Sequence, residues 1–348
     1  METFWFIVIA LVLAVYVVLD GFDFGVGMIY LIVGQTDAER SVALKAIGPV
    51  WNGNEVWLIA GGGLLFFAFP KAYAAGFSGF YLALIGVLWL LMFRGLAIEL
   101  RSHLGNPLWR AFWDVAFCAA SLVLAVVFGA ALGNLIRGVP LSPDGYFFVP
   151  LWTTFSPGPH PGILDWFTVL MGVTTAAILM VHGANFLAMK TSGELQQRVR
   201  RGAIAGLWVA LPLTVLAMAA IPVVQPVLHK GLGTDPVRVM LSLGAGVSLL
   251  SMMWCRWRQR DIGAFFSSAV FILALLGNAA WNLYPNLLIA TTSPDYSLTI
   301  HNVATSEYGL QVGFIWLCIG IPLVLAYTIY VYRSFWGKIE LETDETGY

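Results

Sequence analysis

The stretch FWFIVIALVLAVYVVLDGFDFGVG, residues 4–27, decides the fold of this chain. Its first sixteen residues, Phe4 to Leu19, are uncharged and overwhelmingly apolar, and as an α-helix they would extend about 24 Å at about 1.5 Å per residue. A helix that crosses a bilayer needs about 20 mostly apolar residues. No basic region and no small-residue cleavage site accompany the run. It therefore predicts a retained transmembrane helix rather than a signal peptide.

The composition of the whole chain supports the same class. Hydrophobic residues make up 59% of the sequence and charged residues 11%, whereas soluble domains average about 45–50% and about 25%. A soluble domain of this length lacks the core volume to bury so much apolar surface, but lipid tails can contact it directly. The net charge of −1 gives no reason to expect a nucleic-acid partner. Three cysteines without a C-x-x-C spacing predict neither a disulfide framework nor a metal site.

Hydropathy predicts an all-α integral membrane protein with about nine transmembrane helices. Two long segments, 137–161 and 285–308, contain no apolar run able to span a bilayer, and they are predicted as loops. A charged loop is predicted between the fifth and sixth spans, from Lys190 to Arg201. The nine predicted spans are 4–33, 50–69, 75–98, 111–136, 162–189, 203–228, 237–257, 262–284 and 309–334.

Basic residues orient these spans. With the N-terminus outside, 14 of the 18 Lys and Arg residues fall on cytoplasmic segments and 4 on outer segments. Cytoplasmic loops normally carry this excess of positive charge. The bias predicts an outer N-terminus, a cytoplasmic C-terminus, and both long loops on the outer side. Gly21-x-x-x-Gly25 and the run Gly61 to Gly63 offer small faces for close helix contact.

Ionisable side chains within membrane helices are energetically costly and usually functional. Seven polar or charged residues are expected near the cytoplasmic ends of the first four spans, and two pairs of them are spaced three apart, which places each pair on one helix face. Such a cluster suits a proton entry path or a buried ion-paired group that pins the bundle; another ligand is the third alternative. The proton-path candidates are Asp20, Asp23, Asn52, Glu55, Arg94, Glu99 and Asp114.

His182 is the one histidine inside a predicted span. An intramembrane histidine can ligate haem, relay a proton, or form a hydrogen bond between helices. No second histidine lies at a helical partner spacing, so the sequence gives no reason to expect a haem held by this chain alone. His182 is kept as a candidate polar relay, and no metal site is predicted.

Several motifs together resemble subunit II of the cytochrome bd-type quinol oxidases. Each is short, but they are distributed over nearly the whole chain. They are DGFDFGVG (20–27), WNGNEVWL (51–58), FSGFY (77–81), FRG (93–95), ELRS (99–102), FG (128–129), GNL (133–135), GVP (138–140), GEL (193–195) and SLT (297–299).

The resemblance implies an architecture and a set of partners. The fold would be a first four-helix bundle (1–136) carrying the acidic cluster, an outer loop (137–161), a second four-helix bundle (162–284), a second outer loop (285–308), and a peripheral ninth helix with a cytoplasmic tail (309–348). A larger subunit I would hold haem b and haem d. The complex, in a bacterial cytoplasmic (inner) membrane, would oxidise quinol and reduce dioxygen to water. Small accessory membrane subunits and a structural quinone are further expectations.

The resemblance also implies roles for individual residues. Asp20, Asp23 and Arg94 match the acidic pair and the arginine of the family, and Trp57 matches a tryptophan on a gas path. Some members have an aspartate of a proton channel where this chain has Asn52, which cannot titrate. We therefore expect Glu55 to supply the acidic group.

Two other functions fit the sequence less closely. A secondary transporter would also have broken helices and intramembrane polar residues, but it should place them at the midplane of two repeats. A purely structural scaffold would use the acidic cluster only for ion pairing.

Overall fold

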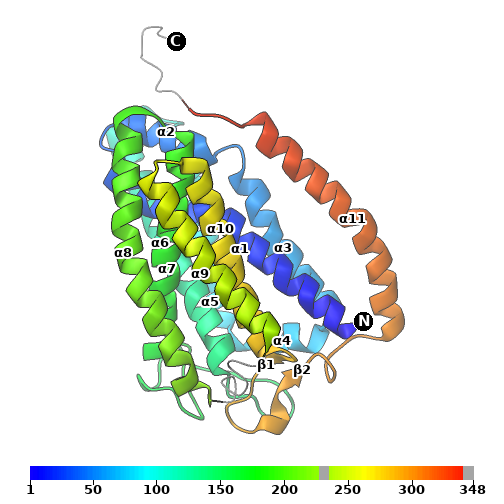
Figure 1. Ribbon diagram of the computed structural model, residues 1–348. Coiled ribbons are helices and arrows are strands. Elements are labelled where there is room, and N and C mark those ends of the chain that lie inside the picture. The colour runs from blue at the N-terminus through cyan, green and yellow to red at the C-terminus, as the bar shows by residue number, and fades with distance from the viewer. Residues whose placement is uncertain (227–234, 340–348) are drawn as a thin grey trace.

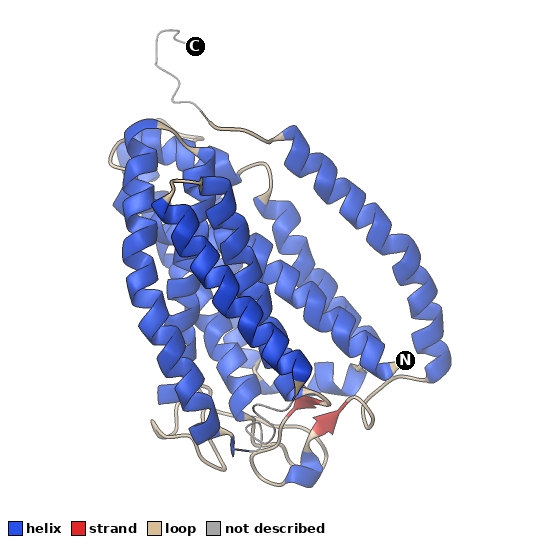
Figure 2. Ribbon diagram, in the orientation of Figure 1, coloured by secondary structure: helices blue, strands red, loops and turns tan. Residues whose placement is uncertain are grey.

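The computed structural model describes residues 1–226 and 235–339, and it confirms the all-α prediction (Figures 1 and 2). The end of the predicted sixth span (227–228) and the end of the predicted cytoplasmic tail (340–348) lie outside these residues. The helices are α1 (Glu2–Val33), α2 (Asp37–Ile47), α3 (Trp51–Ala68), α4 (Pro70–Gly79), α5 (Tyr81–Leu100), α6 (Pro107–Arg137), α7 (Trp166–Lys190), α8 (Gly193–Val224), α9 (Pro236–Trp257), α10 (Asp261–Leu283) and α11 (Glu307–Ser334).

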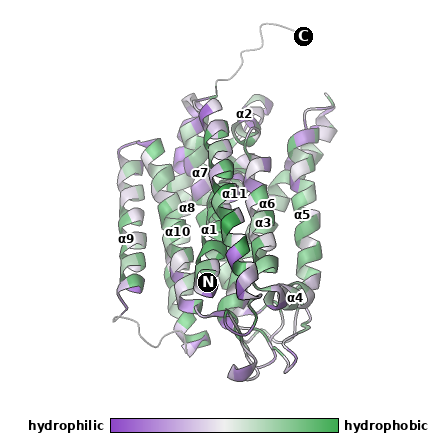
Figure 3. Cartoon of the chain, turned by 90° about the vertical axis from the view of Figure 1, so that its right-hand side faces the viewer, coloured by the Kyte–Doolittle hydropathy of each residue, from purple (hydrophilic) through white to green (hydrophobic). Residues whose placement is uncertain are grey.

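Eight helices in the described parts of the chain are long and apolar enough to cross a membrane: α1 and α5 to α11. α3 is the remaining predicted span. It falls short because Asn52, Asn54 and Glu55 occupy its first turns. It nevertheless lies beside α1 within the bundle, as Figure 1 shows. Residues along the middle of the long helices are mainly hydrophobic, and hydrophilic residues gather toward the two ends (Figure 3).

Two local predictions differ from the structure. The predicted third span is divided into α4 and α5, with Phe80 between them. The charged loop predicted from Lys190 to Arg201 is wrong, because α7 ends at Lys190 and α8 already begins at Gly193. Most of the charged residues therefore lie on the first turns of α8. Its charged residues have partners there: Arg198 pairs with Glu39, and Arg200 pairs with Asp261.

The short helix α2 was not predicted, although its sequence carries a start signal. Thr36 and Glu39 form a capping box, in which each side chain satisfies a backbone N–H at the helix start. Burial alone would raise the pKa of Glu39, but hydrogen bonds from Arg198 and from the backbone N–H groups of Thr36 and Gln35 lower it below the ordinary value.

The two ends of the bundle differ. The two long segments predicted as outer loops form a layer at one end, where strands β1 (Asn286–Leu288) and β2 (Leu298–Thr299) pair antiparallel (Figure 2); this strand pair was not predicted. We call this the β end. α2 and the connections between α5 and α6, α7 and α8, and α9 and α10 lie at the opposite end, which we call the α2 end (Figure 1). The basic segments predicted to share one side of the membrane gather at the α2 end.

α1 and α7 form the centre of the bundle. α7 packs against α1, α6, α8 and α10, and 67% of its most apolar stretch is buried, compared with 0% for α11. The predicted small face of α1 is confirmed, because a Cβ atom added to Gly25 would overlap the Leu179 carbonyl oxygen. In the other predicted small face, only Gly61 meets a neighbour within 4 Å in the described chain, and Gly62 and Gly63 meet none.

Candidate functional site

A buried ion-pair network joins α1, α3 and α5 toward the α2 end. The Arg94 side chain is fully buried, at 0% exposure, and donates to a carboxylate on each side. One guanidinium nitrogen donates to Asp20 Oδ1, and the other donates to Glu55 Oε2 at 3.1 Å. The Arg94 guanidinium also lies 4.7 Å from the centre of the Phe24 ring, which fits a cation–π contact. Three of the predicted candidates therefore form one network.

Asp23 lies one helical turn beyond Asp20 and is also fully buried. Its Oδ2 accepts a hydrogen bond from Asn54 Nδ2 at 2.8 Å, and no described cation pairs with it. The side-chain oxygen of the same amide, Asn54 Oδ1, accepts a hydrogen bond from the Tyr332 hydroxyl of α11 at 2.8 Å. A chain of hydrogen bonds thus connects Asp23 to the peripheral helix. We call Asp20, Asp23, Asn54, Glu55, Arg94 and Tyr332 the buried acid cluster.

The charges of the buried acid cluster do not balance. Arg94 is the one cation and faces three carboxyl groups. Asp20 Oδ2 and Asp23 Oδ1 have no hydrogen-bond partner among the described residues. A buried charge without compensation is strongly unfavourable, because desolvation is not offset by an opposite charge. The cluster therefore has the chemistry to hold one or more protons and to release them.

Asp114 belongs to a second network, closer to the α2 end. It accepts hydrogen bonds from Arg101 Nε at 2.5 Å, from the Tyr30 hydroxyl at 2.6 Å and from Arg40 Nη1 at 3.0 Å. Arg101 also pairs with Asp37 of α2 at 2.6 Å. Burial alone would lower the pKa of Arg101, but hydrogen bonds to Asp114 and Asp37 raise it above its ordinary value. This network has enough cations for its carboxylates, so its geometry fits a structural clamp that ties α2 to α5 and α6.

The remaining predicted residues lie apart from both networks. Asn52 and Glu99 are exposed and line a groove of about 1110 Å³ between α3 and α11. Trp57 lies deeper and lines the same groove, with 9% of its surface exposed. Asn52 and Glu55 were expected to share one inward face. The structure instead directs Asn54 inward and leaves Asn52 on the groove side.

His182 of α7 is fully buried, and both ring nitrogens have hydrogen-bond partners. Nε2 lies 3.0 Å from the Val18 carbonyl oxygen of α1, and Nδ1 lies 2.7 Å from Ser268 Oγ of α10. The ring stacks on Phe265 with centroids 5.0 Å apart. Because a carbonyl oxygen only accepts, Nε2 is the protonated nitrogen, and neither nitrogen has a lone pair directed at open space. His182 therefore joins three helices.

In the haem-containing assembly that the resemblance implies, replacing His182 with alanine is expected to leave the haem absorption bands unchanged, because its two nitrogens already have partners within the chain. The measurement is a reduced-minus-oxidised spectrum per mole of chain. Ser268→Ala is the matched control, since it removes one partner and keeps the imidazole. Loss of a haem band at normal recovery of His182→Ala, but not of Ser268→Ala, would show that the histidine ligates haem.

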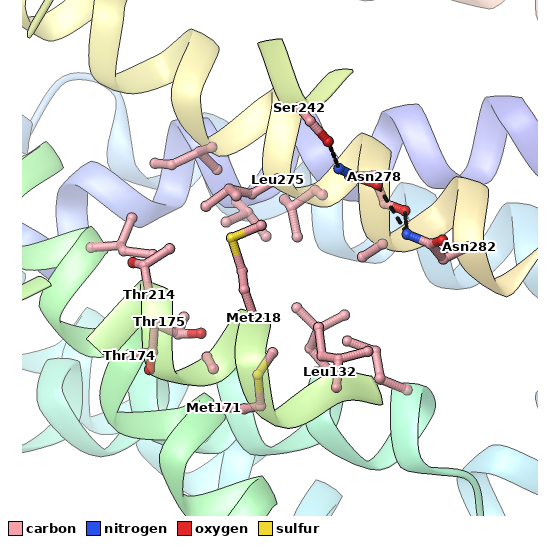
Figure 4. Close-up of a pocket in the computed structure, with 18 of the residues that line it drawn as sticks. Leu132, Met171, Thr174, Thr175, Thr214, Met218, Ser242, Leu275, Asn278 and Asn282 are labelled. Atoms are coloured by element: carbon pink, nitrogen blue, oxygen red, sulfur yellow. Dashed lines mark hydrogen bonds between the residues drawn. The ribbon is translucent and has the colours of Figure 1, made fainter. Parts of the chain in front are cut away.

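A separate apolar cavity of about 220 Å³ lies between α1, α6, α7, α8, α9 and α10 (Figure 4). Its walls carry Met171 and Met218, and threonines of α7 and α8 lie at one side. At another side, Asn278 donates to Ser242 Oγ at 2.9 Å. The cavity suits a small apolar group or part of a chain-like ligand. In the described parts of the chain, no three His, Cys, Asp or Glu side chains are grouped as metal ligands.

Sequence reasoning missed two members of the buried acid cluster. Asn54 stands within the quoted WNGNEVWL motif, and its inward direction depends on the rotation of α3. Tyr332 is 278 residues away from Asn54, and no local pattern distinguishes it from the other aromatic residues of α11.

Comparison with known proteins places these features in context. The family model described as cytochrome bd terminal oxidase subunit II matches residues 1–335. The cytochrome bd-I ubiquinol oxidase subunit 2 of Escherichia coli is 32% identical, covering 98% of this chain and 96% of that protein. The cytochrome bd ubiquinol oxidase subunit 2 of Bacillus subtilis is 31% identical, covering 96% of each. The bd oxidase structure from Geobacillus thermodenitrificans superposes with a TM-score of 0.75 at 18% identity, covering 96% of this chain and 98% of the other, which supports the fold.

Proposed function

The chain belongs to the cytochrome bd terminal oxidase subunit II family and is part of a respiratory oxidase; from this premise we propose that it is the haem-free subunit that supplies protons to the complex. In the proposed reaction, the complex oxidises quinol and reduces dioxygen to water. The chain would stabilise the haem-bearing subunit I, and Trp57 would line a path for dioxygen. The observation that carries the proposal is the buried acid cluster, with one arginine facing three carboxyl groups.

The intramembrane histidine of this chain does not suit a haem. Histidine, methionine, cysteine and tyrosine are the usual axial ligands, and the one histidine within a transmembrane helix is hydrogen-bonded through both nitrogens. We therefore assign haem b and haem d to subunit I and derive no step through them here. The role left to this chain is to move protons, which the reduction of dioxygen to water consumes.

The proposed proton route enters from the α2 end, which the distribution of basic residues predicts to be cytoplasmic. Glu55 is the most accessible carboxylate of the buried acid cluster, with 22% of its side chain exposed. It contacts Arg94, which contacts Asp20, and Asp23 lies one turn further along α1. Glu55 thus has the position of the entry group, in place of the residue that cannot titrate at Asn52.

Replacing Glu55 with glutamine is expected to lower oxygen consumption and charge separation by about ten-fold or more, while the assembled complex is recovered normally. A positioned proton-transfer group contributes about 10²–10⁴-fold, and water can replace part of that contribution because the Glu55 side chain is partly exposed. Both rates are measured on the purified complex. Unchanged oxygen consumption and charge separation would remove Glu55 from the route.

Asp23→Asn distinguishes a proton route from a scaffold. The substitution preserves the shape of the side chain and an oxygen that can accept the hydrogen bond from Asn54, but it removes the titrating group. A proton route predicts lost turnover with assembly intact. A scaffold predicts lost assembly, so the recovery of subunit I with the chain is measured alongside turnover.

The remaining assignments complete the proposal. We place the chain in the bacterial cytoplasmic membrane, with the N-terminus outside and the C-terminus inside, and divide it into two four-helix bundles and a peripheral ninth helix. The cavity of Figure 4 is the place where a structural quinone would fit, because it is apolar and lined by residues of six helices. Small accessory membrane subunits are proposed as further partners. No feature of the described chain favours a secondary transporter over this function.

A further inference from the structure

Tyr16 of α1 lies beside the buried acid cluster, and the proposed proton route does not use it. The residue is 3% exposed, and its hydroxyl has no hydrogen-bond partner among the described residues. Tyr16 precedes Asp20 by four residues, which places the two side chains on one face of α1. Asp20 is also the side chain that acts most strongly on the hydroxyl. Because a buried hydroxyl without a partner is unfavourable, its position points to an acceptor in the cluster.

Two carboxyl oxygens of the cluster are also unpartnered. Asp20 Oδ2 and Asp23 Oδ1 have no hydrogen-bond donor among the described residues. The other oxygen of each group is bonded, since Asp20 Oδ1 accepts from Arg94 and Asp23 Oδ2 accepts from Asn54. The two carboxyl groups stand three residues apart on α1 and interact directly with each other. Two ionised carboxylates can only accept and would repel each other, whereas a proton on one of them converts the contact into a charge-assisted hydrogen bond.

The neighbours of the carboxyl groups decide which of them is neutral. Asp20 is paired with Arg94, whose positive charge stabilises the ionised form of the carboxyl group. Glu55 shares the same arginine, and 22% of its side chain is exposed. No described cation pairs with Asp23, and its hydrogen bond comes from the neutral amide of Asn54. Because a buried carboxylate without a paired cation is strongly unfavourable, the proton belongs on Asp23.

We propose that Tyr16, Asp20 and Asp23 form a proton-storage site on one face of α1, which we call the α1 proton site. Asp23 is the neutral carboxylic acid and donates from Oδ1 to Asp20 Oδ2, while Asp20 stays the carboxylate that pairs with Arg94. The Tyr16 hydroxyl is the second donor to Asp20, from a position about 6 Å further along α1 toward the β end. The inference deepens the proposed function and rests on it, because the stored proton is the one that the route delivers.

Apolar rings cover the α1 proton site on the side of α6. The Tyr16 ring meets the Phe128 ring edge-on with centroids 5.8 Å apart, and Phe24 stacks on the same ring at 6.0 Å. Low polarity strengthens a hydrogen bond and makes an unpaired charge more unfavourable. The titratable groups that act on the site from α3, α5 and α11 are Glu55, Arg94 and Tyr332. Glu55 is the partly exposed one, so it connects the stored proton to the α2 end.

The test is infrared spectroscopy of the purified complex at neutral pH, recorded as the difference between wild type and variant. A protonated carboxyl group has a C=O stretching band that is separate from the bands of carboxylates and of the backbone. We expect such a band to be lost in Asp23→Asn, and to shift when the aspartate carboxyl carbon is isotopically labelled. Asp23→Asn keeps a donor toward Asp20, because the amide nitrogen replaces the acid O–H. Glu55→Gln should keep the band.

Tyr16→Phe tests the third member of the site, because it removes the hydroxyl and keeps the ring. Without this donor, Asp20 becomes a stronger acceptor for the acid O–H of Asp23, so we expect the Asp23 band to shift in frequency. A tyrosine that only fills space would leave the band in place. Tyr73→Phe, on α4 at the β end, is the matched control and should not move it.

Oxygen consumption of the same samples separates this inference from the proposed function. If Asp23→Asn loses the band and keeps its turnover, the α1 proton site stands and proton supply by this chain is refuted. If Asp23→Asn keeps the band, or Glu55→Gln loses it instead, the site is overturned whatever the turnover. If Asp23→Asn cannot be recovered, the site is overturned by a wild-type band that ignores the aspartate label or stays in place in Tyr16→Phe.

Discussion

Replacing Arg94 with methionine is expected to prevent recovery of most of the assembled complex. Methionine approximates the length and apolar stem of arginine but removes the charge that Asp20 and Glu55 share. Removing one partner of a buried ion pair costs about 3–5 kcal/mol, because the other charge stays buried without compensation. That loss is a large fraction of the stability of a typical protein. The measurements are the amount of subunit I that co-purifies with the chain and the melting temperature of the recovered fraction.

A double variant separates the loss of charge compensation from the loss of packing. Asp20→Asn/Arg94→Met removes the fully buried pair together, and replacing both partners of a buried pair is often neutral. We expect it to recover most of the assembly, because two carboxyl groups remain near position 94: Glu55 is partly exposed, and Asp23 keeps the hydrogen bond from Asn54. If the double variant assembles no better than Arg94→Met, the role of Arg94 is its packing against Phe24 rather than its charge.

The residues that sequence alone predicted well are those whose position follows from helix geometry. Asp20, Asp23 and Arg94 end long apolar runs, so their depth follows from counting residues along a span of known length. The distribution of Lys and Arg separated the segments of the α2 end from those of the β end, because basic residues cluster on one side of a membrane. Both arguments use properties of a single helix or loop.

The rest depends on contacts between segments that are distant in sequence. The inward direction of Asn54, in place of Asn52, follows from how α3 rotates against α1, where the side chain meets Asp23. Asp114 was expected to belong to the same cluster as Asp20, but three neighbouring donors hold it in another network. The charged start of α8 stays helical because Glu39 of α2 and Asp261 of α10 pair with its arginines. None of these pairings has a local sequence signal.

α1 carries Asp20 and Asp23 of the buried acid cluster, α7 carries His182, and the two helices pack against each other. At this crossing the two helices touch through their backbones. A Cβ atom at Gly25 would lie 2.7 Å from the Cα and N atoms of Gly183, closer than real Cβ atoms come to a neighbour, and it would overlap the Leu179 carbonyl oxygen. Small residues permit such contact, and van der Waals packing is a main source of helix association in a membrane. Gly25 directly follows Phe24, whose ring packs against the Arg94 guanidinium, so this helix contact is adjacent to the buried acid cluster.

Replacing Gly25 with valine is therefore expected to separate α1 from α7 and to abolish assembly. Overpacking a core usually costs about 1–3 kcal/mol and occasionally more. We expect the upper end or beyond, because backbone atoms cannot rotate away as a side chain would. The measurements are the recovery of the complex and its melting temperature. Gly246→Ala on α9 is the matched control: no described atom lies within 4 Å of its added Cβ, so it should behave like the wild type. If Gly25→Val assembles as well as Gly246→Ala, the close contact at Gly25 does not determine how α1 packs against α7.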